Sequence, residues 1–381
     1  MSDTQKDTKP NVPNLRFPEF REEWKKTVIG KLCSIVGGGT PDTNNKNYWN
    51  GNIQWFTPSE IGKDKYVSAS KRTISFEGLK NSSAKLLPPF SILLSSRATV
   101  GECSINQKEC CTNQGFQSAI PNNSIVSSDF LYYRLLTHKR DFIRKACGST
   151  FLEISAKQIA KINTYLPTRT EQDKIASLLS LIDDRISIQN KVIEKYETLI
   201  KALRHHLFLT IESEKEVTIA DVLSYEQPTK YIVSDTEYSD KKDLTPVLTA
   251  NKAFILGYTE ETDGVYDKGP CIILDDFTLD SKIVDFPFKV KSSAIKILSA
   301  KTSVSLRYIY EYLKFLDLNT EEHKRHYIAE IEPMIIELPD EGTIQSIAGL
   351  FDRLDQRRKG LESDLQLLKS QKDYLLRTIF I

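Results

Sequence analysis

The sequence lacks the signatures that mark most enzymes acting on nucleic acids. It contains no Asn/Asp-Pro-Pro-Tyr/Phe stretch, which marks amino methylation of adenine or cytosine, and no Walker A or GxGxxG loop. Pro41-Asp42 and Pro339-Asp340 are similar to part of a nuclease motif, but no Glu/Asp-x-Lys is convincingly placed after either. Serine, histidine and aspartate occur without the context of a catalytic triad. We therefore predict that the chain is not an enzyme by itself.

Metal-binding patterns and long apolar runs are also missing. The six cysteines include no CxxC pair, so their spacing fits neither a zinc site nor a disulfide framework. His323 and His326 have the spacing of ligands on a helix, but no further ligand stands at motif spacing, and we predict no metal site. No run of 18 apolar residues exists. Residues 1–14 are polar and unlike a secretory signal. We expect this segment to be disordered and the protein to be cytoplasmic.

The sequence does contain a long segment that occurs twice, at 166–208 and 338–381, with matching positions 172 residues apart. Leu166-Pro167 matches Leu338-Pro339, for example. In each copy, apolar residues recur in alternating steps of four and three, which predicts a helix of about 40 residues and roughly 60 Å. The predicted apolar positions are Ile175, Leu179, Ile182, Ile186, Ile193, Ile200 and Leu203 in the first copy, and Ile347, Phe351, Leu354, Leu361, Leu365, Leu368 and Leu375 in the second.

A helix with a single apolar stripe needs a partner, and the other copy in the same chain is the obvious one. We predict that the two helices form a coiled coil within the chain. The alternative is a pair of long helices that each pack on a globular domain.

Two globular segments, 15–165 and 209–337, precede the two helices. Both mix strand and helix patterns, which predicts the α/β (α+β) class. Ile219–Leu223 weakly echoes Ile29–Cys33. Residues 1–165 carry 23 Lys and Arg against 14 Asp and Glu, whereas residues 209–337 carry 15 against 24. The first segment could hold a polyanion through its overall field, and the second only through a local basic patch.

In the first segment, an apolar strand ends at Ser95-Ser96-Arg97, and amide side chains flank a glycine in Thr112–Gln117. Arginine, asparagine and glutamine can make two-point hydrogen bonds to base edges. Taken singly, each is more often a turn residue or a solvated one. The candidate DNA-binding residues here are Lys71, Arg72, Ser96, Arg97, Asn113, Gln114 and Thr150.

In the second segment, lysines and aromatic residues interleave around Asp285-Phe286-Pro287-Phe288. The alternative for this stretch is a solvated edge strand. Lys324 and Arg325 lie between the two histidines and could contact phosphate. The candidate DNA-binding residues here are Lys282, Lys289, Lys291, Lys324 and Arg325.

Together, several short blocks resemble the specificity subunit of type I restriction–modification systems, and the resemblance covers nearly the whole chain. The blocks are Leu15–Phe20, Gly39-Thr40-Pro41, Trp55–Pro58, Thr112–Phe116 and Gly148–Phe151. After them, Leu166-Pro167 with Glu171-Gln172 leads into the first long helix.

This resemblance implies two target-recognition domains, 15–165 and 209–337, separated by conserved helices 166–208 and 338–381 that pack antiparallel about a pseudo-twofold axis. Each domain would read one half of a split double-stranded DNA site. The helices would set the gap and dock two modification subunits, which are adenine N6 methyltransferases, and restriction subunits would join the complex. We expect no cofactor on this chain, with S-adenosylmethionine, ATP and Mg²⁺ on the partner subunits. The alternatives are a nuclease or methylase acting alone, and a coiled-coil scaffold without DNA contact.

Overall fold

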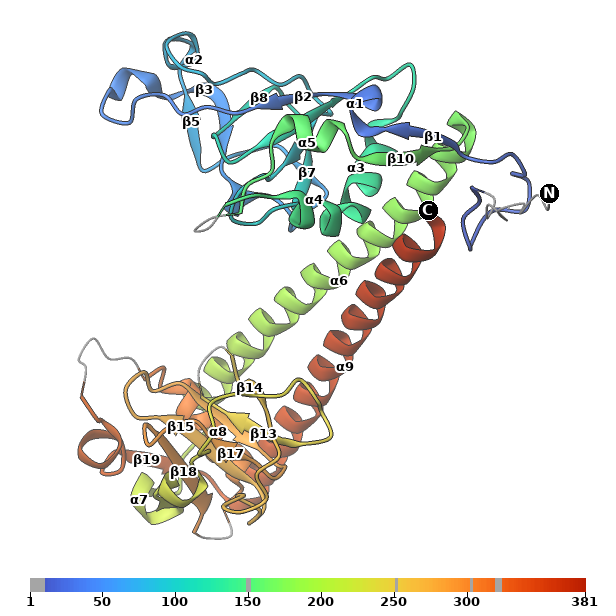
Figure 1. Cartoon of the computed structure of the whole chain (residues 1–381). Coiled ribbons are helices and arrows are strands. Elements are labelled where there is room, and N and C mark those ends of the chain that lie inside the picture. The colour runs from blue at the N-terminus through green and yellow to red at the C-terminus, as the bar shows by residue number, and fades with distance from the viewer. Residues whose placement is uncertain (1–10, 149–151, 251–252, 302–303, 319–323) are drawn as a thin grey trace, which may run out of the picture. The chain divides into compact units, whose positions relative to one another are not determined.

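A computed structural model describes residues 11–148, 152–250, 253–301, 304–318 and 324–381 (Figure 1). The candidate residues Thr150 and His323, and most of the segment expected to be disordered, lie outside the described residues. The chain divides into two compact units, residues 1–191 with 363–381, and residues 192–362. Each unit combines β-sheets with helices, as predicted.

Two long helices, α6 (Arg169–Thr210) and α9 (Glu341–Ile379), carry the repeated segments. All the predicted apolar seam positions are buried or half-buried. In the first unit, Ile175 and Ile379 line one pocket, and Asp183 pairs with Lys372 at 2.6 Å. Contacts therefore move backward along α9 as they move forward along α6, so the helices are antiparallel. The prediction of two paired long helices is confirmed.

In the second unit, the same two helices pair again. The Tyr196 hydroxyl of α6 donates to the Leu354 carbonyl of α9 at 3.3 Å, and Arg204 lies 5.7 Å from the Phe351 ring centroid. Neither helix begins at its Leu-Pro pair, because each leucine ends a short strand instead. Proline has no N–H to continue a strand ladder, so the strand ends there.

Both units share a frame of two short strands. In the first, β1 (Lys25–Val28) pairs antiparallel with β10 (Asn163–Leu166), and Lys25 faces Leu166. In the second, β11 (Lys215–Thr218) pairs antiparallel with β19 (Ile335–Leu338), and Lys215 faces Leu338. A helical turn and a strand follow each first strand, so the predicted echo is a structural one. These elements are α1 (Ile29–Leu32) with β2 (Cys33–Gly37), and α7 (Ile219–Val222) with β12 (Leu223–Glu226).

Beyond the β1–β10 frame, the globular segment of the first unit forms two further sheets. A five-stranded sheet has the order β2-β9-β6-β7-β4, and a three-stranded sheet has the order β5-β3-β8. Its strands are β3 (Trp49–Phe56), β4 (Tyr66–Val67), β5 (Arg72–Ile74), β6 (Ile92–Leu94), β7 (Cys103–Asn106), β8 (Cys110–Thr112) and β9 (Gln117–Pro121). Its helices are η1 (Lys46–Tyr48), η2 (Pro58–Glu60), α2 (Phe76–Lys80), α3 (Ser128–Thr137), α4 (Lys139–Lys145) and α5 (Ala156–Ala160).

The second unit also combines a larger sheet, β12-β18-β15-β16, with a three-stranded sheet, β14-β13-β17. Its strands are β13 (Thr245–Leu248), β14 (Ile255–Thr259), β15 (Cys271–Asp275), β16 (Ser281–Val284), β17 (Lys289–Val290) and β18 (Ile295–Ala300). Its helices are η3 (Pro228–Tyr231), α8 (Leu306–Phe315) and the π-helical turn η4 (Tyr327–Ile331).

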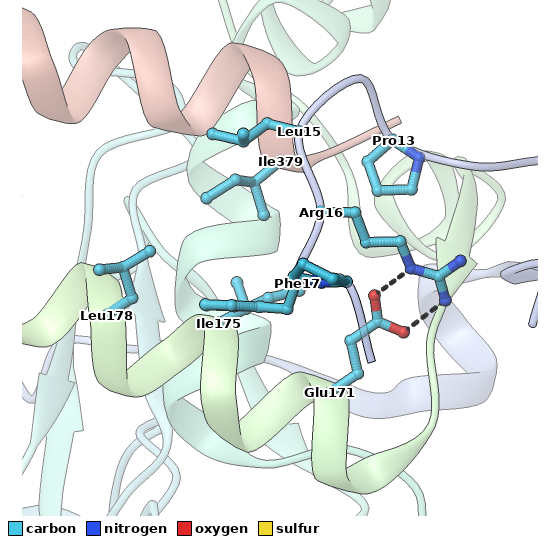
Figure 2. Close-up of a pocket in the computed structure, with 9 residues that line it drawn as sticks. Pro13, Leu15, Arg16, Phe17, Glu171, Ile175, Leu178 and Ile379 are labelled. Atoms are coloured by element: carbon cyan, nitrogen blue, oxygen red, sulfur yellow. Dashed lines mark hydrogen bonds and ion pairs between the residues drawn. The ribbon is translucent and has the colours of Figure 1, made fainter. Parts of the chain in front are cut away.

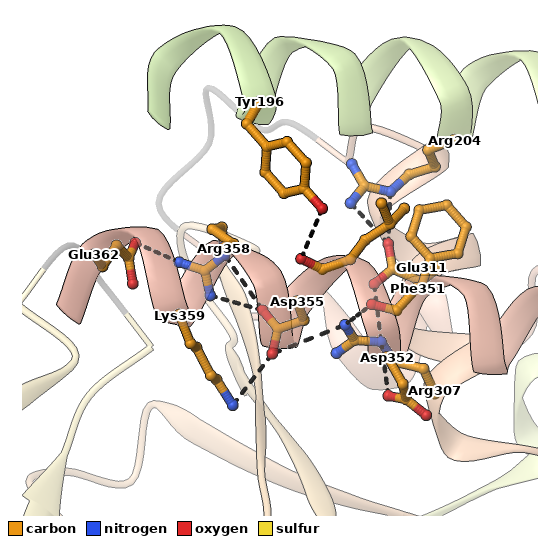
Figure 3. A network of polar contacts seen from close by, with 11 residues as sticks. Tyr196, Arg204, Arg307, Glu311, Phe351, Asp352, Asp355, Arg358, Lys359 and Glu362 are labelled. Carbon is orange, nitrogen blue, oxygen red and sulfur yellow. Dashed lines mark hydrogen bonds and ion pairs between the residues drawn. The ribbon is translucent and has the colours of Figure 1, made fainter. Parts of the chain in front are cut away.

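Polar contacts attach α8 to the two long helices in this unit (Figure 3). The Glu311 carboxylate of α8 accepts from Arg204 of α6 at 2.7 Å and lies 3.3 Å from Arg307. Arg307 also donates to the Phe351 carbonyl of α9 at 2.9 Å. Glu311 is buried, so its charge is balanced inside the protein.

The N-terminal segment packs on the helix pair of the first unit (Figure 2). The Arg16 guanidinium makes two hydrogen bonds to the buried Glu171 carboxylate, and the Trp24 indole donates a third at 3.2 Å. A cavity of about 220 Å³ adjoins the Arg16–Glu171 ion pair. It is lined by Pro13, Leu15, Arg16, Phe17, Pro18, Glu171, Ile175, Leu178 and Ile379.

Candidate nucleic-acid interface

The three-stranded sheet of the first unit brings two predicted groups of residues to one edge. Strand β8 runs parallel to β3, so Thr112 faces Phe56, and Asn113 N–H donates to the Phe56 carbonyl at 3.1 Å. Strand β5 runs antiparallel to β3, and its first residue, Arg72, faces Trp55. Because β5 begins where β3 and β8 end, Lys71 and Arg72 lie at the same edge as Asn113 and Gln114. We call this edge, with those four residues, the β3 edge.

A tight loop places a third group beside the β3 edge. Ser96 N–H donates to the Gly115 carbonyl at 2.8 Å, which places Arg97 beside the Asn113-Gln114 turn. Ala98 and Gly101 have φ angles of 63° and 90°, in the left-handed region, so the chain reverses sharply after Arg97. The structure therefore gathers six of the seven candidates of the first unit, and Thr150 is the exception that lies outside the described residues.

The gathered side chains differ in how free they are to bind a ligand. The Asn113 side-chain oxygen accepts from Gly115 N–H at 2.9 Å, which is the bond of a local turn. Gln114 is exposed, and its oxygen accepts from the Thr40 hydroxyl. Ser96 is buried. Arg97 donates from Nε and Nη2 to Glu153 at 3.1 and 2.5 Å, so an ion pair already occupies its guanidinium.

Arg72 differs from these residues because its guanidinium stacks on an aromatic ring. Its side chain is exposed, and its guanidinium carbon lies 3.6 Å from the centroid of the Trp49 ring. Within the described parts of the chain, no side chain or carbonyl accepts a hydrogen bond from this guanidinium. Lys71, its neighbour, is exposed as well.

The second unit repeats the plan of this edge. Strand β14 runs antiparallel to β13 and β17 runs parallel to it, as β5 and β8 do with β3. Lys291 N–H donates to the carbonyl of Leu248, the last residue of β13, at 3.1 Å. This is the bond that Asn113 makes to the last residue of β3. Lys291 therefore occupies the place of Asn113, and its side chain is exposed.

Lys289 does not reach the surface of this edge. It is buried, with Nζ 2.7 Å from Glu261 and 2.6 Å from the Asp263 carbonyl. Lys289 faces Val247 of the central strand, as the buried Cys111 faces Trp55 in the first unit. Since its charge is balanced inside the unit, Lys289 presents no free cation to DNA in this structure.

The remaining candidates of the second unit lie around one turn or near it. Arg325 is exposed, and its Nη2 is 3.5 Å from the Ser293 hydroxyl, two residues beyond Lys291. Lys324 pairs with Glu330 at 2.9 Å. Lys282 is half-buried on β16. The burial of Lys314, and next the positive charge of Lys282, lower the pKa of Lys314. Lys291 and Arg325 are thus the cations that the structure brings together.

The sequence interpretation missed the platform under Arg72. Trp49 and Trp55 are buried on β3, and the sequence blocks gave them no role at an interface. The arginine and Trp49 are far enough apart in sequence that only the β3–β5 register, with its irregularity between Trp49 and Ile53, brings them together.

No group of three or more histidine, cysteine, aspartate or glutamate side chains in the described ranges is arranged to hold a metal ion. His326 is buried, and its Nδ1 lies 2.7 Å from Glu330. None of the helices described here has the length and apolar composition that crossing a membrane requires.

Residues 21–198 match the family described as Type I restriction modification DNA specificity domain. Residues 21–198 of this chain are thus similar to a type I DNA specificity domain. This domain includes the whole β3 edge and the first part of α6. The recognition suggested by the sequence blocks is therefore confirmed.

The chain is also similar in sequence to specificity subunits of type I restriction enzymes. Over 213 residues, the chain is 34% identical to the Type I restriction enzyme MjaIX specificity subunit of Methanocaldococcus jannaschii, covering 54% of this chain and 49% of that one. Over 169 residues, it is 40% identical to the Type I restriction enzyme EcoR124I/EcoR124II specificity subunit of Escherichia coli, covering 41% and 42%. The match thus spans about half the length of these relatives.

The fold extends the likeness beyond the specificity domain. A crystal structure of the type I restriction-modification system S subunit from M. genitalium superimposes with a TM-score of 0.60 at 16% identity. The superposition covers 97% of this chain and 99% of that one. At this identity, the likeness establishes a shared fold.

Proposed function

We propose that this chain is the DNA-specificity subunit of a type I restriction–modification complex and that it reads a two-part site in double-stranded DNA. The observation that carries the proposal is the β3 edge, which lies inside the specificity domain and gathers Lys71, Arg72 and Gln114 as exposed polar side chains. Lysine and arginine bind phosphate and base edges, and glutamine binds adenine. The first unit would read one half of the site.

The second unit would read the other half. Its sheet repeats the topology of the β3 edge, and Lys291 and Arg325 adjoin one turn there. The side chains at the two edges differ, so the two half-sites should differ in sequence. The acidic surroundings of the second edge should make its binding depend more on local contacts than on the long-range field.

A second apolar stripe on α6 supports docking of partner subunits. In the first unit, Leu181 and Ile188 are 64% and 60% exposed and do not belong to the predicted seam positions. They stand at heptad-compatible spacing, which suits another helix. In the first unit, a groove of about 630 Å³ lies beside Ile188 and Leu367. We propose that modification subunits, which are adenine N6 methyltransferases, bind this surface.

In this scheme the chain itself performs no catalysis and binds no cofactor. The modification subunits would supply the methyl transfer with S-adenosylmethionine. Restriction subunits, which use ATP and Mg²⁺, would join the assembled complex in the cytoplasm.

The proposal is tested by producing the chain with its modification partners and sequencing the methylated adenines in the host DNA. We expect one motif made of two specified halves and a fixed gap. The purified chain alone should neither methylate nor cleave DNA, and activity of the chain alone would support a stand-alone enzyme. If the assembled complex binds no duplex, the chain is a scaffold instead.

An exchange of one unit tests the division of labour. Replacing residues 209–337 with the matching segment of a related subunit should change one half of the methylated motif. The other half should persist, because residues 15–165 are unchanged. A swap that altered both halves would show that the two segments form one continuous reading surface.

A further inference from the structure

We infer that Arg72 reads a guanine in the half-site contacted by the first unit, with Trp49 as the platform that holds its guanidinium. The inference rests on the proposed function and assigns a base-reading role to one residue of the β3 edge. Arginine makes two parallel hydrogen bonds to O6 and N7 of guanine in the major groove, and this is the commonest specific contact between arginine and a base.

The platform under Arg72 is rigid. Trp49 and Trp55 pack at right angles with ring centroids 5.1 Å apart, and only 8% and 4% of their surfaces are exposed. Both indole N–H groups are hydrogen-bonded, that of Trp49 to the Asp42 carbonyl at 3.0 Å and that of Trp55 to the Gly39 carbonyl at 2.9 Å. Neither ring can turn without breaking such a bond, so the surface beneath the guanidinium has a fixed orientation.

The backbone of Arg72 is held as firmly. The Ser70 hydroxyl donates to the Arg72 carbonyl at 2.6 Å and accepts from Trp55 N–H at 2.9 Å. The Gln54 side chain accepts from Ser70 N–H at 2.6 Å. These bonds tie the start of β5 to the central strand, so the side chain leaves the sheet from a defined point.

Stacking uses the face of the guanidinium and leaves its edge available. The 3.6 Å approach to Trp49 is that of a stacked cation, and Trp55 lies 5.8 Å away. A planar guanidinium carries five N–H donors around its edge, and none of them has an acceptor within the described residues. The fork is therefore oriented in advance and still has its donors to offer.

Arg97 provides the contrast beside the same edge. Its Nε and Nη2 donate to Glu153, so a base must first replace that carboxylate. Gln114 must likewise share the oxygen that Thr40 already contacts. Among these three side chains, only that of Arg72 has no polar atom already engaged by another described residue.

The test uses the full chain assembled with its modification partners, and the readout is the motif of methylated adenines in host DNA. Arg72→Lys keeps the positive charge but loses the planar fork. We expect this variant to accept other bases at one position where the wild type requires a G·C pair, with discrimination falling about 5- to 100-fold there. Arg21→Lys, which changes an exposed, unstacked arginine, should leave the motif unchanged.

Each outcome decides between distinct readings. An unchanged motif for Arg72→Lys, or uniformly weaker methylation of the same motif, would overturn the base-reading role and leave the proposed function standing. A wild-type complex without any defined motif would overturn the proposed function itself. If Arg72→Lys lowers the melting temperature, Arg72→Met decides the matter, because it covers Trp49 without any donor. The Met variant should relax the same position, and an unrelaxed motif counts against the inference.

Discussion

Arg16 and Glu171 form a two-point ion pair between residues 155 positions apart in the sequence. Nε and Nη2 of the arginine reach the two carboxylate oxygens at 2.7 and 2.8 Å. The carboxylate is buried, and Trp24 donates to it as well. The pair thus fixes the N-terminal segment to the start of α6.

We predict that Glu171→Ala destabilises the first unit by about 3–5 kcal/mol, because it leaves the Arg16 charge without its partner. Urea unfolding followed by circular dichroism measures this loss, and limited proteolysis should then cleave before residue 24 more readily. Glu19→Ala is the matched control, since it breaks the exposed pair between Glu19 and Lys174 and should leave the stability of the first unit almost unchanged. Equal losses of unfolding free energy in the two variants would mean that the buried pair stabilises the unit no more than the exposed pair does.

Substitutions at two adjacent residues of α6 should affect different properties, one the stability of the chain and the other its association with a partner. Ile182 is 6% exposed and lies in the seam, whereas Leu181 is 64% exposed. Ile182→Lys buries an unpaired charge and should destabilise the chain by several kcal/mol. Leu181→Lys should leave the stability of the chain unchanged and weaken its association with the modification subunit. Thermal melting and co-purification distinguish the two, and normal co-purification of Leu181→Lys would exclude the stripe from docking.

The stability of the first unit should fall at mildly acid pH because of His138. Burial and the nearby Arg134 charge lower its pKa to about 4, although Asp141, 2.8 Å away, opposes the shift. The pKa of histidine in an unfolded chain is about 6.5. Between these values the unfolded state binds a proton that the folded state does not, so stability falls as pH falls, by up to about 1.4 kcal/mol per pH unit.

Urea unfolding at several pH values between 4 and 7.5 tests this expectation. His138→Asn should flatten the slope below pH 6.5 and leave the profile above it unchanged. A slope that survives in His138→Asn would assign the acid sensitivity to other groups.

In the second unit, Glu311→Ala should be costly because it leaves Arg204 and Arg307 beside each other without the carboxylate between them (Figure 3). We expect a loss of about 3–5 kcal/mol in the free energy of unfolding. Asp173→Ala, which removes the exposed pair with Arg169, should change it by less than about 1 kcal/mol. A small loss in Glu311→Ala would show that water or another side chain replaces the carboxylate.

The gap of the DNA site should follow the helix pair. Tyr196 faces Leu354, so four residues inserted after Glu197 and four after Arg353 lengthen both helices at facing positions. Four residues add about 6 Å to a helix, and one base pair spans about 3.4 Å. We expect the methylated motif to keep both halves while its gap grows by one or two base pairs. Loss of recognition without a moved gap would contradict the role of the helices as a ruler.

The heptad pattern could be predicted from sequence because periodicity along one helix is a local property. The stripe from Ile175 to Leu203 shows which face is dry, and the structure buries it. Contacts between neighbouring strands depend on the pairing register, which cannot be read directly from the sequence. The lysines at 289 and 291 look alike in sequence, yet one meets Glu261 inside the unit and the other faces outward. The same limit hid the stack of Arg72 on Trp49.

All three tryptophans of the chain, Trp24, Trp49 and Trp55, belong to the first unit. Their fluorescence therefore reports on that unit alone, and the second unit is spectroscopically silent at tryptophan wavelengths. Trp24 lies against Phe130 and Phe380, so its emission senses the joining of the N-terminal segment to the end of α9. Trp49 lies beneath Arg72, so a duplex that engages this arginine should alter its emission. A single optical signal can thus follow unfolding and DNA binding in one half of the protein without any label.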